Sequence, residues 1–230
     1  AIRSSITDRT RMIMVNSPCN PTGAVYTREE IEEIVSIAIE HDLWIISDEI
    51  YSRLIWNGGE HVSPATIEGG KERTIVISGW SKTWAMTGMR VGFLAGPEQA
   101  VRAAVKCQAN SASHIPTFMM EAARVALDCD DHVERFSDAY RHRRNLIVQG
   151  LEDIPGLRIV NPEGAFYLFI DVTGTGMSDV QFADGALKAG VQLIPASLIT
   201  GGEGFIRVSY AASEEDIKEG INRLRSWLLE

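Results

Sequence analysis

The sequence predicts an α/β protein with a mainly parallel sheet and helices on both of its faces, followed by a smaller α+β domain. The first observation is a set of short, continuously apolar runs, which lie at residues 11–15, 43–47, 74–78 and 91–95. Runs that are apolar on both faces are typical of strands buried between helix layers. The second observation is an amphipathic helical pattern between the first two runs. The third is a change, after residue 131, to a closer alternation of strand and helix patterns.

The helix between the first two runs has a well-defined start. Thr27-Arg28-Glu29-Glu30 is a capping box, in which the threonine and the glutamate three residues later each accept a backbone N–H. The apolar residues behind it recur on one helix face; they are Ile31, Ile34, Val35, Ala38 and Ile39. Pro97 suits the first turn of a further helix that reaches Lys106 or beyond. Two more helices are expected at residues 116–127 and 131–151, and the second is long and polar, which is typical of a connector between domains.

The rest of the chain predicts a second, smaller domain. Strands are expected at residues 157–160, 166–171, 191–195 and 205–210, and helices at 178–189 and 213–228. Ser213, with Asp216 three residues later, is typical of a helix N-cap. We therefore predict one domain at residues 1–131 and a small α+β domain at residues 132–230, entered by the long connecting helix.

Composition and charge exclude several classes of protein. Hydrophobic residues make up 45% of the chain and charged residues 23%, which is globular composition. With 22 Lys and Arg against 31 Asp and Glu, the formal charge of −9 disfavours binding to nucleic acid. The chain shows no apolar stretch near the ~18 residues of a membrane span and no metal-ligand spacing among its histidines. Residues 1–5 lack the apolar run that is typical of a signal peptide. Its three cysteines lie outside any C-x-x-C pattern and indicate reduced thiols, so a cytoplasmic location is expected.

Ligand sites in open α/β sheets lie at the carboxyl ends of the strands, so the residues after each apolar run are the candidates. After the first run, the prolines and glycine of Asn16–Gly23 set a turn that leaves the Asn20 amide able to donate; turn chemistry alone is the alternative. Asp48 and Tyr51 follow the second run. A carboxylate in this place needs a cation or hydrogen-bond donors, and a helix-capping role for Asp48 is the alternative.

The segment after the third run contains a lysine and an arginine. Lys82 lies in an apolar setting, where an ammonium tends to lose its proton and become a nucleophilic amine; its neighbours are Trp80, Trp84, Ala85 and Met86. A lysine with a packed stem and a solvated head is the alternative. Arg90 lies between Gly88 and Gly92, whose small size allows an anion to approach closely. The glycine patterns of a P-loop and of a dinucleotide-binding fingerprint are absent.

In the predicted small domain, Arg207 lies in the middle of the apolar strand pattern at residues 205–210. A buried guanidinium favours a planar, bidentate anion, and a substrate carboxylate is such an anion. A structural ion pair is the alternative for this arginine.

Four blocks in a fixed order resemble the class I/II aminotransferases, which are fold-type I pyridoxal-phosphate enzymes. The blocks are Asn-Pro-Thr-Gly from Asn20, Asp-Glu-Ile-Tyr from Asp48, Ser-Lys-Thr with Met-Thr-Gly-Met-Arg-Val-Gly from Ser81, and Ile-Arg-Val-Ser-Tyr-Ala from Ile206. The similarity covers essentially all 230 residues. It implies a partial fold-type I large domain followed by the small domain, in an enzyme that acts as a homodimer.

The resemblance implies roles around the cofactor. Lys82 would bind pyridoxal 5′-phosphate covalently and would later move the proton between the substrate α-carbon and the cofactor. Asp48 would keep the pyridine nitrogen protonated. Asn20 and Tyr51 would bond the phenolic oxygen.

It also implies residues for the phosphate and the substrate. Arg90, with Ser78 or Ser81, would bind the phosphate. Arg207 would bind the α-carboxylate of the amino or 2-oxo acid, and Asn20 would take part in binding the substrate.

The sequence departs from the family pattern in two places. Gly79 stands where many members have a phosphate-binding serine. Residues 195–200 read Pro-Ala-Ser-Leu-Ile-Thr in place of the more usual Pro-Gly-Ser-x-Phe-Gly. Family members also begin well upstream of Ala1, so we expect this chain to be the carboxy-terminal part of such an enzyme. By itself it is expected to lack part of the cofactor site and to be inactive.

The predicted function is transfer of an amino group between an α-amino acid and a 2-oxo acid. A carbon–sulfur β-lyase of the same fold is an alternative, because the cofactor contacts alone do not decide between the two reactions. A non-catalytic, ligand-sensing aminotransferase-like domain is a further alternative. The expected partners are the two substrates and a second copy of the chain, with no nucleic acid and no membrane.

Overall fold

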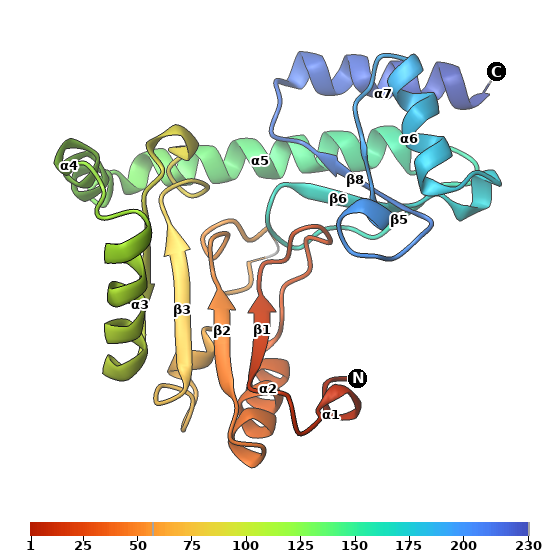
Figure 1. The fold of residues 1–230 in the computed structure, drawn as a ribbon. Coiled ribbons are helices and arrows are strands. Elements are labelled where there is room, and N and C mark those ends of the chain that lie inside the picture. Colours follow the sequence, from red (N-terminus) through yellow and green to blue (C-terminus); the bar gives the residue numbers. More distant parts are fainter. Residues whose placement is uncertain (57, 230) are drawn as a thin grey trace. The chain divides into compact units, whose positions relative to one another are not determined.

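The computed structural model describes residues 1–56 and 58–229. The chain divides into two compact units. The first unit comprises residues 1–18 and 25–134, and the second comprises residues 19–24 and 135–230. Each unit has its own β-sheet, as Figure 1 shows.

Over its described residues, the first unit contains a four-stranded sheet. The strands, in their order across the sheet, are β1 (Met12–Asn16), β2 (Trp44–Asp48), β3 (Thr74–Gly79) and β4 (Gly92–Ala95). The first three run parallel (Figure 1). β4 runs antiparallel to β3. The mainly parallel sheet is confirmed, and the four predicted strands are found with each end shifted by at most one residue.

Helix α2 (Arg28–Glu40) packs on one face of this sheet and begins at the predicted capping box. The Thr27 hydroxyl accepts from the Glu30 N–H at 3.3 Å, and the Glu30 carboxylate accepts from the Thr27 N–H at 2.8 Å. The core joins the helix to β1 and β2; it consists of Val15, Ile31, Ile34, Val35, Ala38, Leu43 and Ile45. The prediction for Ile39 is wrong, because this side chain is 45% exposed and the buried stripe extends to Ile37 instead.

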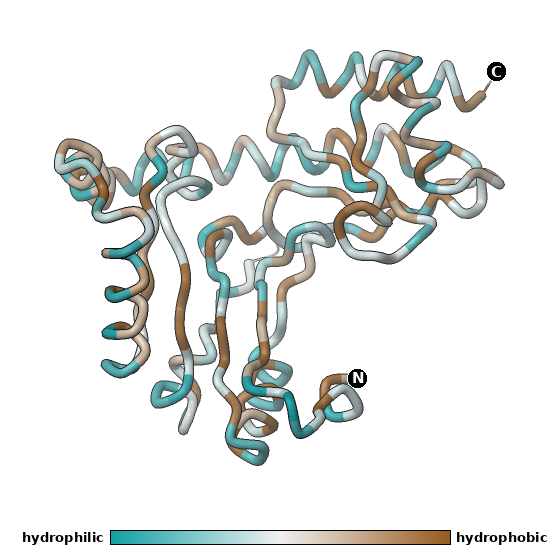
Figure 2. Tube along the Cα trace, viewed as in Figure 1, coloured by the Kyte–Doolittle hydropathy of each residue, from teal (hydrophilic) through white to brown (hydrophobic). Residues whose placement is uncertain are grey.

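The opposite face of the sheet is exposed in the described chain. Side chains alternate along a strand, so the neighbours of the residues that meet α2 point to the other face. On that face, Met12 and Met14 are 50% and 69% exposed, and Ile77 and Leu94 are 38% and 36% exposed. Figure 2 shows how hydrophobic these strands are. Burial on both faces, expected from the apolar composition of the strands, is wrong for these four residues, because α2 packs on the face of Val15 and Ile45.

Further helices complete the first unit. These are α1 (Ile2–Ser5), α3 (Glu98–Ser111) and α4 (Thr117–Ala126). α3 begins directly after Pro97, whose φ of −56° already suits a helix. The long helix α5 (Asp130–Leu151) begins in the first unit and continues in the second. α3, α4 and α5 lie where the sequence predicts helices, whereas the short α1 had no signal.

The second unit contains an antiparallel sheet and the two last helices. Its strands are β5 (Arg158–Ile159), β6 (Tyr167–Asp171), β7 (Ile194–Pro195) and β8 (Phe205–Ser209), in the order β5-β6-β8-β7. The helices are α6 (Asp179–Lys188) and α7 (Glu214–Leu229). Leu168 and Ile206 are fully buried in the sheet, and the buried Tyr210 hydroxyl donates to the Ala165 carbonyl oxygen at 3.1 Å. The predicted α+β architecture is confirmed.

Candidate active site

The carboxyl end of β2 positions the first candidate residue, Asp48. It ends the strand and pairs in register with Asn16 of β1 and Ile77 of β3. The Asn16 side-chain amide donates to the Asp48 carbonyl oxygen at 3.1 Å. The Ile50 N–H donates to Asp48 Oδ1 at 3.2 Å. A bond from a side chain to the backbone two residues later is an Asx turn, which orients the half-buried carboxylate at the end of the strand.

Lys82 lies near Tyr51 in the first unit. The lysine follows β3 and is half-buried. Its Nζ lies 6.0 Å from the centre of the Tyr51 ring, and Tyr51 is buried. The first unit therefore contains the lysine, the tyrosine and the Asp48 turn.

The segment around Lys82 has an aromatic surround. Trp80 and Trp84 stack with their ring centres 5.8 Å apart, and Phe93 of β4 meets the Trp80 ring edge-on at the same separation. Ala85, which the sequence places in the apolar setting of the lysine, is exposed. Ala85 therefore does not form part of a buried apolar setting, and the aromatic ring that lies near Lys82 Nζ is that of Tyr51.

Arg90 has an unusual backbone conformation. Its φ is 52°, in the left-handed region that residues other than glycine rarely adopt, and Ala85 has the same φ. Such a conformation costs on the order of 1–3 kcal/mol and is concentrated at functional sites. The Arg90 side chain is exposed, and its Nη1 donates to the Thr87 carbonyl oxygen at 3.0 Å. The arrangement presents a guanidinium to solvent from a strained turn.

The structure explains the glycine at position 79. A Cβ atom there would lie 2.7 Å from the Val91 carbonyl oxygen and 2.9 Å from Gly92 Cα, so a serine does not fit between β3 and β4. The candidate Ser78 is half-buried, and its hydroxyl donates to the Glu49 carbonyl oxygen at 3.3 Å. Ser81 is also half-buried, in the turn that follows β3.

Glu49, which is buried beside Asp48, was not among the residues predicted from the sequence. Its Oε1 accepts from the Ser63 hydroxyl at 2.5 Å, and its Oε2 lies 3.0 Å from His61 Nε2. Burial raises the pKa of the Glu49 carboxyl, but the contacts with His61 and Ser63 outweigh it and hold this pKa below its usual value. In the sequence, Glu49 could have been recognised only as a second carboxylate at the end of an apolar strand pattern.

Arg207 of β8 belongs to the second unit, together with Asn20. Its Nη1 donates to Asn20 Oδ1 at 3.0 Å, and its guanidinium carbon lies 4.8 Å from the centre of the Tyr167 ring. Its Nε is buried without a hydrogen-bond partner. Within residues 1–56 and 58–229, no carboxylate forms an ion pair with Arg207, so the structural ion pair weighed as an alternative is not observed.

The loop that carries Asn20 is held within the second unit. It contains the cis peptide bond Asn20–Pro21. The Gly23 carbonyl oxygen accepts from the N–H groups of Glu163 and Gly164, both at 2.9 Å. Gly23 has a φ of 71°, and a Cβ atom there would lie 2.3 Å from the Pro162 Cβ. Only glycine allows this approach, and the approach fixes the place of the exposed Asn20.

The unusual loop at residues 195–200 is anchored to helix α6. The Ser197 N–H donates at 2.9 Å to Oδ2 of Asp179, the buried first residue of the helix. Burial raises the pKa of the Asp179 carboxyl, but the hydrogen bonds from Ser197 outweigh it and lower this pKa. The loop therefore has a fixed attachment despite its departure from the family pattern.

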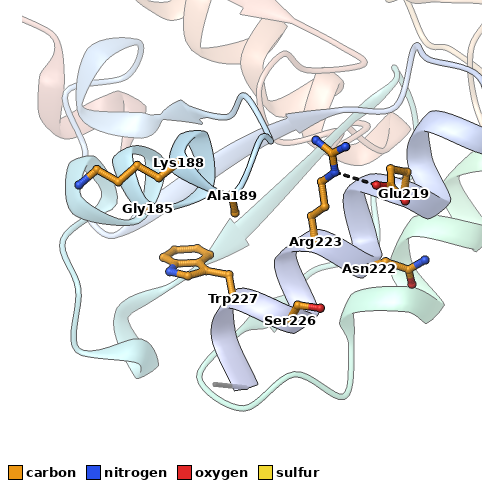
Figure 3. Close-up of a pocket in the computed structure, with 8 residues that line it drawn as sticks. All are labelled: Gly185, Lys188, Ala189, Glu219, Asn222, Arg223, Ser226 and Trp227. Atoms are coloured by element: carbon orange, nitrogen blue, oxygen red, sulfur yellow. Dashed lines mark hydrogen bonds and ion pairs between the residues drawn. The ribbon is translucent and has the colours of Figure 1, made fainter.

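A separate hollow lies between α6 and α7 (Figure 3). It has a volume of about 630 Å³, and it contains none of the predicted site residues; it is lined by Gly185, Lys188, Ala189, Glu219, Asn222, Arg223, Ser226 and Trp227. The Arg223 Nε donates to Glu219 Oε1 at 2.8 Å, as Figure 3 shows. The charges of Arg223 and Glu219 thus pair with each other.

The part of the chain that the structure describes contains neither a metal-ligand cluster nor a membrane-spanning helix. No group of three or more histidine, cysteine, aspartate or glutamate side chains there is placed to hold a metal ion. Among the helices in those residues, none combines the length and apolar character needed to cross a membrane.

Comparison with known proteins points to one family. A sequence model described as "Aminotransferase class I and II" matches residues 1–224. The aromatic-amino-acid aminotransferase 2 of Thermococcus litoralis is 42% identical over 98% of this chain and 59% of its own length. The aspartate aminotransferase of Pyrococcus abyssi is 39% identical over 100% of this chain and 60% of its own. The chain thus spans about three fifths of the length of these relatives.

Solved structures agree with the sequence comparison. The aromatic aminotransferase from Pyrococcus horikoshii OT3 matches 99% of this chain with a TM-score of 0.96 and 41% identity, over 62% of its own length. The aspartate aminotransferase from Thermus thermophilus with maleate matches 99% with a TM-score of 0.92 and 37% identity, over 59% of its length. Sequence and fold together confirm the resemblance seen in the four motif blocks. The chain belongs to the class I and II aminotransferase family.

Proposed function

We propose that the protein containing this chain is a pyridoxal-phosphate-dependent aminotransferase, which exchanges an amino group between an α-amino acid and a 2-oxo acid. The observation that carries the proposal is the position of Lys82, 6.0 Å from the Tyr51 ring, in the same unit as Asp48 at the end of β2. Membership of the family supports the same reaction class. So do the relatives, which are named as aromatic-amino-acid and aspartate aminotransferases.

The residues present fit pyridoxal phosphate. This cofactor needs an amine for its aldehyde, an anion for its protonated ring nitrogen and cationic donors for its phosphate. Lys82 supplies the amine, Asp48 the carboxylate, and Arg90 an exposed guanidinium, and all three belong to the first unit. The donor set therefore matches the three polar groups of the cofactor.

In this proposal, Lys82 and Asp48 carry the chemistry at the cofactor. Lys82 binds it covalently and moves a proton to and from the α-carbon of the substrate. Asp48 keeps the ring nitrogen protonated, because an anion nearby favours the cationic form. When bound, pyridoxal phosphate supplies an electron sink that stabilises negative charge at the α-carbon.

The other residues orient the two ligands. Tyr51 and Asn20 donate to the phenolic oxygen, and Arg90 with Ser78 or Ser81 binds the phosphate. Arg207 binds the α-carboxylate, aided by Asn20. Support for this last role comes from the buried Arg207 Nε, a charged donor without a hydrogen-bond partner, since a planar guanidinium binds a carboxylate best with two donors at once.

We further propose a homodimer that acts in the cytoplasm on amino acids and 2-oxo acids, and that binds neither nucleic acid nor membranes. The resemblance to the family supports the dimer, and the formal charge of −9 supports the absence of nucleic acid. Sedimentation of the active enzyme is the test of the dimer, and an active monomer would contradict it.

Borohydride reduction and peptide mapping test the cofactor assignment. In the protein that contains this chain, the label is expected on Lys82 and is expected to disappear in Lys82→Ala. Lys71→Ala, a change of an exposed lysine in the same unit, is the matched control and should keep the label. A label on another lysine would contradict the assignment.

Product analysis tests the reaction. An aminotransferase forms the 2-oxo acid of its donor only when an acceptor is supplied. Release of ammonia and pyruvate without an acceptor would instead show the carbon–sulfur lyase reaction. Binding of an amino acid with no product in either assay would favour the ligand-sensing alternative.

A further inference from the structure

The buried Glu49 has no part in the proposed chemistry, yet it stands directly beside Asp48. Its side chain is only 10% exposed, and that of His61 only 13%. The Ser63 hydroxyl donates to Oε1 at 2.5 Å, and His61 Nε2 lies 3.0 Å from Oε2. Both oxygens of the carboxylate are therefore engaged by a segment that lies 12 to 14 residues further along the chain.

The backbone of Glu49 joins the carboxyl ends of two neighbouring strands. Its N–H donates to the Ile77 carbonyl oxygen of β3 at 2.8 Å. Its carbonyl oxygen accepts from the Ser78 hydroxyl at 3.3 Å and from the Ser52 N–H at 2.9 Å. Glu49 thus adjoins two parts of the proposed cofactor site, the Asp48 turn and the phosphate-binding candidate Ser78.

A buried pair of ionisable groups is by itself weak evidence for a stabilising role. Desolvation of two buried ionisable groups offsets most of their attraction, so such a pair is often replaceable by apolar residues without loss of stability. Both carboxylate oxygens of Glu49 have a partner, whereas Nδ1 of His61 has none among the described residues. Buried polar contacts on both oxygens restrict the carboxylate to one geometry, because each group accepts few other arrangements. The contacts of Glu49 therefore indicate a role in orientation.

We propose that Glu49 and His61 form a positioning pair that holds the Asp48 carboxylate and the Ser78 hydroxyl in the orientation in which they bind the cofactor. This inference rests on the proposed function. Neither residue touches the cofactor or the substrate in the proposal. Their effect passes through the turn at Asp48 and through the end of β3.

Four variants and two measurements test the pair in the complete protein. Glu49→Gln removes the charge, His61→Phe removes both ring nitrogens, and His61→Gln restores one N–H donor. Glu60→Gln changes an exposed carboxylate next to His61 and is the matched control. The measurements are the dissociation constant of pyridoxal phosphate from absorbance titration and, without cofactor, hydrogen exchange at the amides of Ile50 and Ser52.

Glu49→Gln and His61→Phe are expected to raise the dissociation constant by at least about fivefold and amide exchange by at least about tenfold, because one buried partner is lost. His61→Gln should recover a large part of both losses, and Glu60→Gln should match the unchanged protein. A lower thermal midpoint with an unchanged dissociation constant and unchanged exchange would overturn the proposal. That result would assign the pair a purely structural role.

The proposal stays testable if a variant fails to fold or if the proposed function fails. If Glu49→Gln fails to fold, Ser63→Ala removes a single donor and should still raise both quantities by at least about twofold; no change would overturn the proposal. If borohydride labels no cofactor on Lys82 of the unchanged protein, the proposed function fails. In that event, faster exchange in Glu49→Gln still supports the orienting role at the Asp48 turn, and unchanged exchange rejects it.

Discussion

The guanidinium of Arg207 lies over the ring of Tyr167, with 4.8 Å between the guanidinium carbon and the ring centre. The two residues come from neighbouring strands, since Tyr167 is in β6 and Arg207 in β8. A cation above an aromatic face is attracted by the π-electrons, by roughly 0.5–2 kcal/mol. The ring therefore helps to hold the plane of the guanidinium that binds the carboxylate in our proposal.

The first prediction concerns this ring. Tyr167→Leu keeps an apolar side chain but removes the aromatic face, and should lower kcat/KM by about 0.5–2 kcal/mol of transition-state stabilisation, mainly through KM. Tyr167→Phe keeps the face and should stay close to the unchanged enzyme. Steady-state kinetics with an α-amino acid as substrate measure kcat/KM for both variants. Equal losses in both variants would assign the effect to the hydroxyl.

The second prediction concerns Arg207. Arg207→Lys keeps the positive charge but loses the planar fork, so kcat/KM should fall by about 1.5–3 kcal/mol while the absorbance of the bound cofactor persists. Arg158→Lys, in β5 of the same sheet, is the control and should leave kcat/KM unchanged. Thermal unfolding is measured in parallel. If Arg207→Lys loses stability and activity in equal measure, the arginine is structural and the carboxylate role is wrong.

The third prediction concerns the glycine that replaces the family serine. Gly79→Ser should destabilise the protein by about 1–3 kcal/mol and should not tighten cofactor binding, because the new Cβ meets backbone atoms of Val91 and Gly92. Gly88→Ser is the control, since a Cβ at that position meets no atom within 4 Å. Thermal unfolding and cofactor titration make the measurement. Tighter binding by Gly79→Ser would show that the strands can separate to admit the serine.

The fourth prediction concerns stability at low pH. Asp171 accepts from the Thr173 hydroxyl at 2.6 Å, from the Thr173 N–H at 2.9 Å and from Arg158 Nη2 at 2.7 Å, and these bonds hold the pKa of its carboxyl below the usual value. A lowered native pKa stabilises the fold fully above the unfolded pKa of about 3.9. This contribution disappears as the pH falls through the native pKa.

Asp171→Asn should therefore lower the free energy of unfolding at pH 7, and the difference from the unchanged protein should shrink as the pH falls below about 4. Denaturant unfolding between pH 7 and pH 3 measures it. Asp184→Asn, which changes an exposed carboxylate in the same unit, should have no such pH-dependent effect. A difference that grows on acidification would show that the contacts of Asp171 do not lower the pKa of its carboxyl in the folded protein.

Local signals in the sequence predicted the strands of both sheets and the helices α2 to α7, but not the short α1. The capping box at Thr27 sets the start of α2 because its two bonds join residues three positions apart. The apolar runs predicted the strands, since short runs of apolar and β-branched residues favour the extended conformation. The order of the motif blocks indicated the family without any structural information.

Contacts between distant residues could not be predicted in the same way. The exposure of Met14 depends on what packs on its face of the sheet, which the apolar run does not record. The engagement of Glu49 by His61 requires a loop to return to the strand end. The glycine at position 79 had no explanation in the sequence, because its cause is the carbonyl of Val91 on the neighbouring strand.

The loop Cys19–Ala24 limits how segments of this chain can be exchanged with those of relatives. It follows β1 in the chain but packs with residues beyond 135, through the bonds from Glu163 and Gly164 to Gly23. A gene segment that encodes only residues 135–230 would omit both this loop and Asn20. The second unit is therefore not a module that a single recombination event can exchange between relatives. A chimaera must take the loop and the later segment from the same parent, or the Pro162 region loses the glycine that it packs against.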